Sequence, residues 1–209
     1  MFSLLLALPA HAEIADSPKN QVDQADRYKT AKFGKTVEAW ASHLNDKDPE
    51  ARLEAVKLLG ESADPQANQY LIEAVDNSDA RVAPLAIDYL GRVKAKDAVP
   101  VLSEKLFLKG TNAVLNQHIL VALGRIGDPD ASQRILDFVQ GETDPSLRGM
   151  AIRVLGEIGS QAIGTDLRKL SEHESDSQQR TLMQDAAARI AARATDAAQG
   201  SSLPNGLHK

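Results

Sequence analysis

A histidine beside a glutamate, His173-Glu174, is the first place in this sequence where side chains could do chemistry. Imidazole and carboxylate groups are ligands for iron and other transition metals, and a two-iron centre needs several of them converging on the metals. The sequence contains one such pair, at the expected end of a helix. We therefore expect a solvated polar helix end here and predict no metal site.

Other residues with chemical potential are equally isolated. Asp76 and Asp79 flank Asn77-Ser78 and could suggest calcium, but carboxylates at a turn are better explained as helix caps. His43 and His118 have no partner at a ligand spacing and are expected on ordinary helix faces. There is no GxSxG, no Gly-rich phosphate loop, no HExxH and no calcium-loop spacing. The chain has no cysteine, which excludes disulfides, thiolate zinc sites and cysteine nucleophiles. We predict no catalytic and no cofactor-binding residues.

Composition indicates which elements must position the remaining side chains. Of the 209 residues, 43% are apolar but only 4% are aromatic. An interior of small and straight-chain aliphatic residues favours closely crossing helices over β-sheets. The formal net charge of −5 does not favour binding to phosphate-rich partners.

The N-terminus differs from the rest of the chain. An apolar run from Phe2 to Leu8 is followed by Ala10-His11-Ala12, which has the form of an export cleavage site, although no Lys or Arg precedes the run. The run is too short to span a bilayer, which takes about 20 apolar residues. We interpret residues 1–12 as a signal peptide truncated at its beginning. The protein is then expected to be periplasmic or secreted; if the segment is only an apolar tail, it is expected to be cytoplasmic. Stable membrane insertion is not expected.

The chain repeats itself. DPEARLEAVKLLG, from Asp48 to Gly60, is closely matched by DPSLRGMAIRVLG, from Asp144 to Gly156. Intermediate copies close on Leu-Gly at Gly91 and Gly124, so the glycine spacings are 31, 33 and 32 residues. A fifth, degraded copy begins at Asp176 and has Ala187-Ala188 in place of Leu-Gly. The fifth slot of the pattern is Arg in three copies, Arg52, Arg148 and Arg180, and Ala83 or Asn116 in the others.

Each copy is expected to fold as a helical hairpin. The Asp or Asn caps the first helix, Pro can follow as the first helical residue, and apolar residues recur at three- and four-residue steps. We expect the Gly to end this helix in the left-handed conformation, and Pro84 to kink the helix that contains it. A second helix follows with its own apolar stripe at equivalent positions, namely Trp40, Leu71, Leu102, Ile135 and Leu167. Because one hairpin cannot cover its own apolar face, stacked hairpins are expected to share a continuous core.

The pitch, the Asp-Pro start, the central Ala and the Leu-Gly ending together resemble the HEAT repeat, and in particular the phycobilisome-lyase-type HEAT-like repeat, from Thr36 to Ile190. The resemblance implies an all-α fold, a right-handed α-solenoid of about five HEAT-like helical hairpins. We divide the chain into the signal peptide (1–12), a polar segment with a capping helix at 18–32 (13–35), the repeat domain (36–192) and a disordered tail (193–209).

Two relatives implied by this resemblance are enzymes. Deoxyhypusine hydroxylase holds two irons with His-Glu pairs from several repeats, which the single pair here does not match. Phycobilin lyases clasp a tetrapyrrole and its client protein, and an exported chain with few aromatic residues fits that task poorly. An enzyme or enzyme subunit of the phycobilin-lyase-like or hydroxylase/oxidoreductase type stays the alternative to a non-enzymatic scaffold.

The second helices are expected to line the concave face of such a superhelix, with the residues opposite the core stripe pointing into a groove. Two rows of these positions hold five carboxylates: Glu73, Asp97, Glu104, Asp130 and Asp137. Such rows are either an ordinary solvated surface or an acidic groove for a basic or polar segment of a protein partner. They disfavour nucleic acid. On the second reading the chain is an exported protein-interaction scaffold, and these five residues are its predicted partner-binding site.

Overall fold

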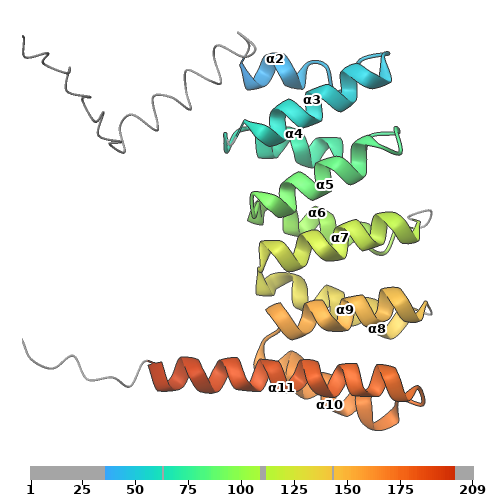
Figure 1. Ribbon diagram of the computed structural model, residues 1–209, viewed down its shortest axis with the longest axis vertical. Coiled ribbons are helices and arrows are strands. Elements are labelled where there is room, and N and C mark those ends of the chain that lie inside the picture. The colour runs from blue at the N-terminus through green and yellow to red at the C-terminus, as the bar shows by residue number, and fades with distance from the viewer. Residues whose placement is uncertain (1–35, 63, 109–111, 143, 201–209) are drawn as a thin grey trace, which may run out of the picture. The chain divides into compact units, whose positions relative to one another are not determined.

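The computed structural model describes residues 36–62, 64–108, 112–142 and 144–200, and within these ranges the chain is helical without a strand (Figure 1). The expected signal peptide (1–12), the polar segment with its capping helix (13–35) and residues 201–209 lie outside the described residues. Among the described residues, no helix combines the length and the apolar character needed to cross a membrane.

From Val37 on, the helices alternate between two roles. The first helices of the repeats are α3 (Pro49–Glu61), α5 (Val82–Arg92), α7 (Ala113–Ile126), α9 (Pro145–Ile158) and α11 (Ser177–Gly200). The second helices are α2 (Val37–Ala41), α4 (Ala67–Ala74), α6 (Val99–Lys105), α8 (Ser132–Gly141) and α10 (Gln161–His173). Short 3₁₀ turns, η1 (Lys96–Ala98) and η2 (Pro129–Ala131), lead into α6 and α8.

The helices form two layers. Each first helix packs against the next, α3 on α5, α5 on α7, α7 on α9 and α9 on α11, and Figure 1 shows this layer in front. Behind it, α2 contacts α4, α6 contacts α8 and α8 contacts α10, while α4 meets the turn η1. The predicted all-α solenoid is confirmed. In the described residues it consists of four two-helix hairpins flanked by the single helices α2 and α11.

Four of the predicted cap residues act as expected. The side chain of Asp48 accepts from the backbone N–H of Glu50, Asn112 from that of Leu115, and Asp144 from those of Ser146 and Leu147. Asp176 accepts from the backbone N–H groups of Gln178 and Gln179 at the start of α11. Each therefore satisfies backbone donors that have no partner within the helix.

Near Pro84 the prediction of a kink was wrong. Helix α5 begins only at Val82, because Asp79 does not cap the helix directly but accepts from Arg81 N–H in the turn before it, at 3.0 Å. Pro84 is consequently the third helical residue, within the first turn. A missing N–H is harmless there because those N–H groups have no carbonyl partner within the helix.

The role predicted for the repeated glycines was also wrong. Gly60, Gly91, Gly124 and Gly156 lie inside their helices, and the described glycine with a positive φ is Gly127, at 73°. A Cβ on Gly91 would stand 2.8 Å from the Cα of Ala122 in α7, and one on Gly156 would stand 3.2 Å from the Cα of Ala186 in α11. The glycine slot therefore lets successive first helices approach closely instead of ending each helix.

The stripe predicted for the second helices forms the core. Its five members, Trp40, Leu71, Leu102, Ile135 and Leu167, are all buried, as are the Leu residues of the Leu-Gly pairs, Leu59, Leu90, Leu123 and Leu155.

At the C-terminal end the predicted domain boundary was too early. Helix α11 continues through 193 to Gly200. The Arg193 guanidinium donates to the carbonyls of Gly156 and Gly159, at 2.9 Å for the latter, and so fastens this part of α11 to the end of α9. The Ala-rich sequence also has high helix propensity.

Candidate partner-binding surface

The five predicted site residues all belong to the second-helix side of the stack. Glu73 lies on α4, Glu104 on α6 and Asp137 on α8, whereas Asp97 and Asp130 lie in the turns η1 and η2. The structure therefore divides the five residues into two groups.

Glu73, Glu104 and Asp137 form what we call the acidic row. Each follows the buried core residue of its helix by two positions, which turns it about 200° away from the core. Glu73 and Glu104 are exposed, and Asp137 is half-buried and accepts from Gln133 Nε2 at 3.1 Å. The row occupies one register position on three successive second helices.

The row has natural ends. In α10 the same position is Lys169, whose ammonium lies 3.5 Å from the Asp166 carboxylate. At the N-terminal end the equivalent position is the exposed Ser42, directly after the end of α2. The row is thus acidic over three repeats and changes character on both sides.

Asp97 and Asp130 have a simpler structural role. Both stand just before a helix, where negative charge interacts favourably with the helix dipole. Asp130 donates its backbone N–H to the Asp128 carboxylate at 3.0 Å. These two residues lie at the connections between first and second helices and do not continue the acidic row, so their part in a binding site stays a prediction.

A cleft adjoins the N-terminal end of the acidic row. It lies between α2 and α4, has a volume of about 300 Å³, and includes Glu73 in its wall. Its other polar lining residues are Glu38, Ser42, Asn45, Tyr70, Asp76 and Asn77. Sequence reasoning missed this cleft. The core stripe had been extended one repeat towards the N-terminus, to Trp40, and the same extension of the acidic row would have led to Ser42, which lines the cleft.

Asp76 is not the helix cap that the sequence predicted. Its carboxylate pairs with the Lys105 ammonium, whose side chain is only 13% exposed, at 2.5 Å. This pair joins α6 to the end of α4 and neutralises a lysine that directly follows Glu104. Glu73 and Glu104 themselves make no ion pair within the described residues.

The histidines also differ from expectation. His118 Nδ1 lies 2.8 Å from Asp88 Oδ1 on the neighbouring first helix, and His43 Nδ1 lies 3.3 Å from Asp46 Oδ2, so both have carboxylate partners. Across the part of the chain that the structure describes, no group of three or more His, Asp or Glu side chains could hold a metal ion.

Glu174, predicted to be solvated, is a structural residue. Its carboxylate pairs with Arg148 at 2.6 Å and accepts from Asp176 N–H, while its carbonyl accepts from Arg180. The backbone hydrogen bond from Asp176 and the Arg148 guanidinium hold the pKa of Glu174 below its ordinary value. Its neighbour His173 is exposed at the end of α10, as predicted.

The repeated arginines explain the fifth slot of the pattern. Arg52 and Arg180 each donate to a carbonyl of the loop that precedes their own helix, that of Asp46 and that of Glu174. Arg148 donates to the carbonyl of Val139, near the end of α8. Arg52 also reaches Asp79 of the next repeat at 2.8 Å, and Arg148 reaches Glu174. These arginines link consecutive repeats and are not available to a partner.

Comparison with known proteins agrees with this architecture. A family model described as HEAT repeats matches residues 37–115 and 104–188. No curated protein matches the sequence.

Solved structures resemble the chain in fold. An engineered protein is 19% identical with a TM-score of 0.50, over 86% of this chain and 93% of that one. A second engineered protein is 19% identical with a TM-score of 0.51, over 86% of this chain but 56% of the other. The complex of CpcE and CpcF of phycocyanin lyase from Nostoc sp. PCC7120 is 20% identical with a TM-score of 0.49, over 87% and 79%. At these identities the likeness concerns the fold alone. The matched repeats cover most of the sequence, and the chain belongs to the HEAT-repeat family.

Proposed function

We propose that this chain is a non-enzymatic protein-interaction scaffold whose second-helix layer holds a basic or polar segment of a partner protein. The acidic row carries the proposal, because Glu73, Glu104 and Asp137 recur in one register on three successive helices. Membership of the HEAT-repeat family supports it, since stacked repeats present extended surfaces suited to elongated partners.

The chemistry of the row selects the partner. A segment that runs along the stack would meet one carboxylate per repeat, so cationic side chains spaced along it are the complementary match. The cleft between α2 and α4 offers room for a long side chain beside Glu38, Glu73 and Asp76. Phosphate-rich partners are disfavoured on this face, because the row and the net charge of −5 repel them.

Charge reversal tests the proposal with a defined ligand. A fluorescein-labelled hexalysine peptide is titrated against the parent protein and against the double variant Glu104→Lys/Asp137→Lys. Glu104 is exposed, and the half-buried Asp137 has one hydrogen bond, from Gln133 on its own helix. Surface positions of this kind contribute little to folding, so the thermal midpoint should change only slightly. Peptide affinity should fall, and the fall should be largest at low salt because salt screens these charges over roughly 10 Å.

A matched control separates the row from net charge. Glu157→Lys/Asp185→Lys reverses two exposed carboxylates on the first helices α9 and α11, so the net charge changes equally. This variant should bind the peptide nearly as well as the parent. If both double variants weaken binding to the same extent, the acidic row is only a solvated surface and the proposal is wrong.

The enzymatic alternatives predict a resident group. A lyase-like protein should carry or bind a tetrapyrrole pigment, and a hydroxylase-like protein should copurify with iron. We propose that the purified chain binds its partner without carrying a pigment or a metal. Absorption spectra and elemental analysis of the purified chain would check this.

We also propose that the protein is exported. Cleavage after Ala12 would leave Glu13 as the first residue of protein recovered outside the cytoplasm. N-terminal sequencing of protein from cell fractions tests this, and recovery of the intact segment from Phe2 to Leu8 on cytosolic protein would contradict it.

A further inference from the structure

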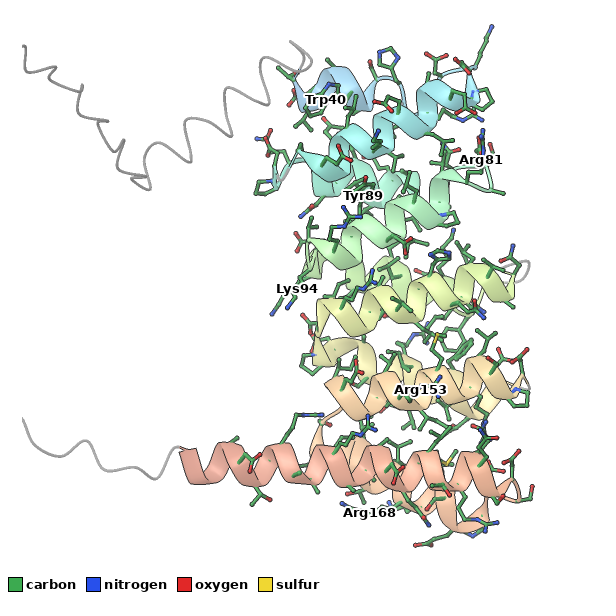
Figure 2. All side chains as sticks on the ribbon, in the orientation of Figure 1. Trp40, Arg81, Tyr89, Lys94, Arg153 and Arg168 are labelled. Carbon is green, nitrogen blue, oxygen red and sulfur yellow. The ribbon has the colours of Figure 1, made fainter. Side chains whose placement is uncertain are left out.

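A second charged surface, positive instead of negative, lies where the first helices α5 and α7 end. An open depression of about 570 Å³ is lined by Gly91, Arg92, Lys94 and Arg125, that is, by the ends of α5 and α7. Figure 2 shows Lys94 at one edge of the stack and Arg81 at the other. We call this hollow, with its three cations Arg92, Lys94 and Arg125, the basic depression.

Its cations are not neutralised by neighbours. Arg92, Lys94 and Arg125 are exposed, and none of them makes an ion pair in the described ranges of the chain. The exposed Lys96, two residues after Lys94, is paired by contrast, because its ammonium lies 3.8 Å from the Asp128 carboxylate. The Arg92 guanidinium stacks over the Tyr89 ring at 4.5 Å from its centroid, which fixes its position.

Lys94 adopts an uncommon backbone conformation. Its φ is 55°, in the left-handed region that disfavours side chains. The Lys94 N–H donates to Gly91 O at 3.3 Å and the Ala95 N–H to Leu90 O at 3.0 Å. These two bonds form the Schellman motif that ends α5, in which Lys94 takes the position usually filled by glycine.

The next repeat shows what folding alone prefers at this position. The slot three residues after the repeated glycine holds Gly127 there, with a φ of 73°. Gly159 fills the slot in the following repeat, where the backbone is extended with a φ of −65° and makes no left-handed turn. Lysine at this slot therefore works against the backbone at the end of α5. A role for the Lys94 ammonium outside the fold explains its presence better than helix termination does.

Favourable helix electrostatics account for only part of the basic depression. Cations in the last turn of a helix interact favourably with its dipole, which would explain Arg92 and Arg125. Lys94 lies beyond the end of α5 in a position that penalises it. Three unpaired cations around one hollow are the complement of an anion with more than one negative group.

We propose that the basic depression binds a carboxylate-rich segment of a protein partner. This inference does not depend on the second-helix site, which takes a segment of opposite charge. A protein segment is favoured over nucleic acid or an anionic membrane because the cations cover only the ends of α5 and α7. A longer polyanion would run onto Glu61, at the end of α3, and Asp97, in η1, on a chain whose net charge is −5.

Titration with a fluorescein-labelled hexaglutamate peptide tests the proposal on the full chain. Arg125→Gln and Lys94→Gly should each weaken binding about two- to fivefold, the range for an exposed ion pair. Lys94→Gly should do so while its thermal midpoint equals or exceeds that of the parent, because glycine relieves the backbone strain. Lys94→Arg keeps the charge and should retain the affinity.

Arg168→Gln is the matched control, because Arg168 is exposed on α10, away from the basic depression (Figure 2). It should leave hexaglutamate binding unchanged. No binding of the peptide by the parent, or equal binding by the parent and both Lys94→Gly and Arg125→Gln, would overturn the proposal. Binding of an oligothymidine or of phosphatidylglycerol vesicles in place of the peptide would overturn it as well, by identifying a different class of partner.

Discussion

At Gly91 the absence of a side chain allows α5 to lie against α7. The obstacle to a Cβ there is the backbone of Ala122, which cannot rotate away, whereas at Gly60 it is the buried ring of Tyr89, 2.1 Å from the ideal Cβ position. In α11 the slot is Ala188, which is exposed because no further helix covers it within the described residues. At Gly60 and Gly91 the glycine is therefore required by the packing of the following repeat, whereas at Gly124 the neighbouring helix leaves room for a Cβ.

Two substitutions at this slot should have different effects. In Gly91→Ala the clash with Ala122 should outweigh the roughly 1 kcal/mol that alanine gains in helix propensity, so the free energy of unfolding should fall by about 1–2 kcal/mol. In Gly124→Ala the nearest atom is Val154 Cγ2 at 3.4 Å, an ordinary contact, and stability should be unchanged or slightly higher. Urea unfolding measures both, and equal stability of the two variants would contradict this role of the slot.

Asp79 should make stability depend on acid pH. The backbone N–H and guanidinium of Arg81, together with Arg52, lower its pKa from 3.8 to about 2. Because the pKa in the folded state is depressed, the stabilisation is fully present above the ordinary value and is lost as pH falls towards about 2. Thermal midpoints of the parent and Asp79→Asn should differ by a constant amount above pH 3.8 and converge below it. A difference that persists unchanged to the lowest pH would show that this carboxylate is not linked to folding.

At the scale of elements, the sequence predicted what depends on nearby residues. Asp48, Asn112 and Asp144 cap their helices because a cap acts within a few positions of itself. The start of α5 depends on a turn around Asp79 that bonds to Arg52 of the previous repeat, so the harmless position of Pro84 could not be read from its own segment. The glycine slot was misread for the same reason, because its partner lies one repeat away.

The central first helix offers an internal test of the repeat register. Leu123 is fully buried in α7, and Leu123→Ala should lower the free energy of unfolding by about 2–5 kcal/mol. Val114 lies on the same helix but is 58% exposed, so Val114→Ala should change it by no more than about 0.5 kcal/mol. Chemical denaturation of both variants checks the prediction, and similar losses would mean that the register assigned to α7 is wrong.

At the scale of the whole molecule, interactions between repeats determine which charges remain available. Sequence periodicity placed Glu73 and Glu104 on one face, but it could not show that Lys105 turns to Asp76. Nor could it show that Arg92, Lys94 and Arg125 meet around one hollow, because Arg125 belongs to the next repeat. Periodicity identifies equivalent positions, whereas pairing between repeats depends on side chains about thirty residues apart.

The stack therefore presents two surfaces of opposite charge, and the two should be separable in one experiment. Glu104→Lys/Asp137→Lys should weaken hexalysine binding and leave hexaglutamate binding intact, because these residues lie on α6 and α8 and do not line the basic depression.

Lys94→Gly/Arg125→Gln should have the reverse effect, since the substitutions remove two cations near the ends of α5 and α7 without touching the acidic row. Titrations of all four combinations at two salt concentrations give the comparison, with the thermal midpoint of each variant as the control for folding. If each double variant changes both affinities in proportion to its net charge, the peptides respond to the overall field of the molecule. If each changes only its own ligand, the scaffold can hold a basic and an acidic segment at the same time.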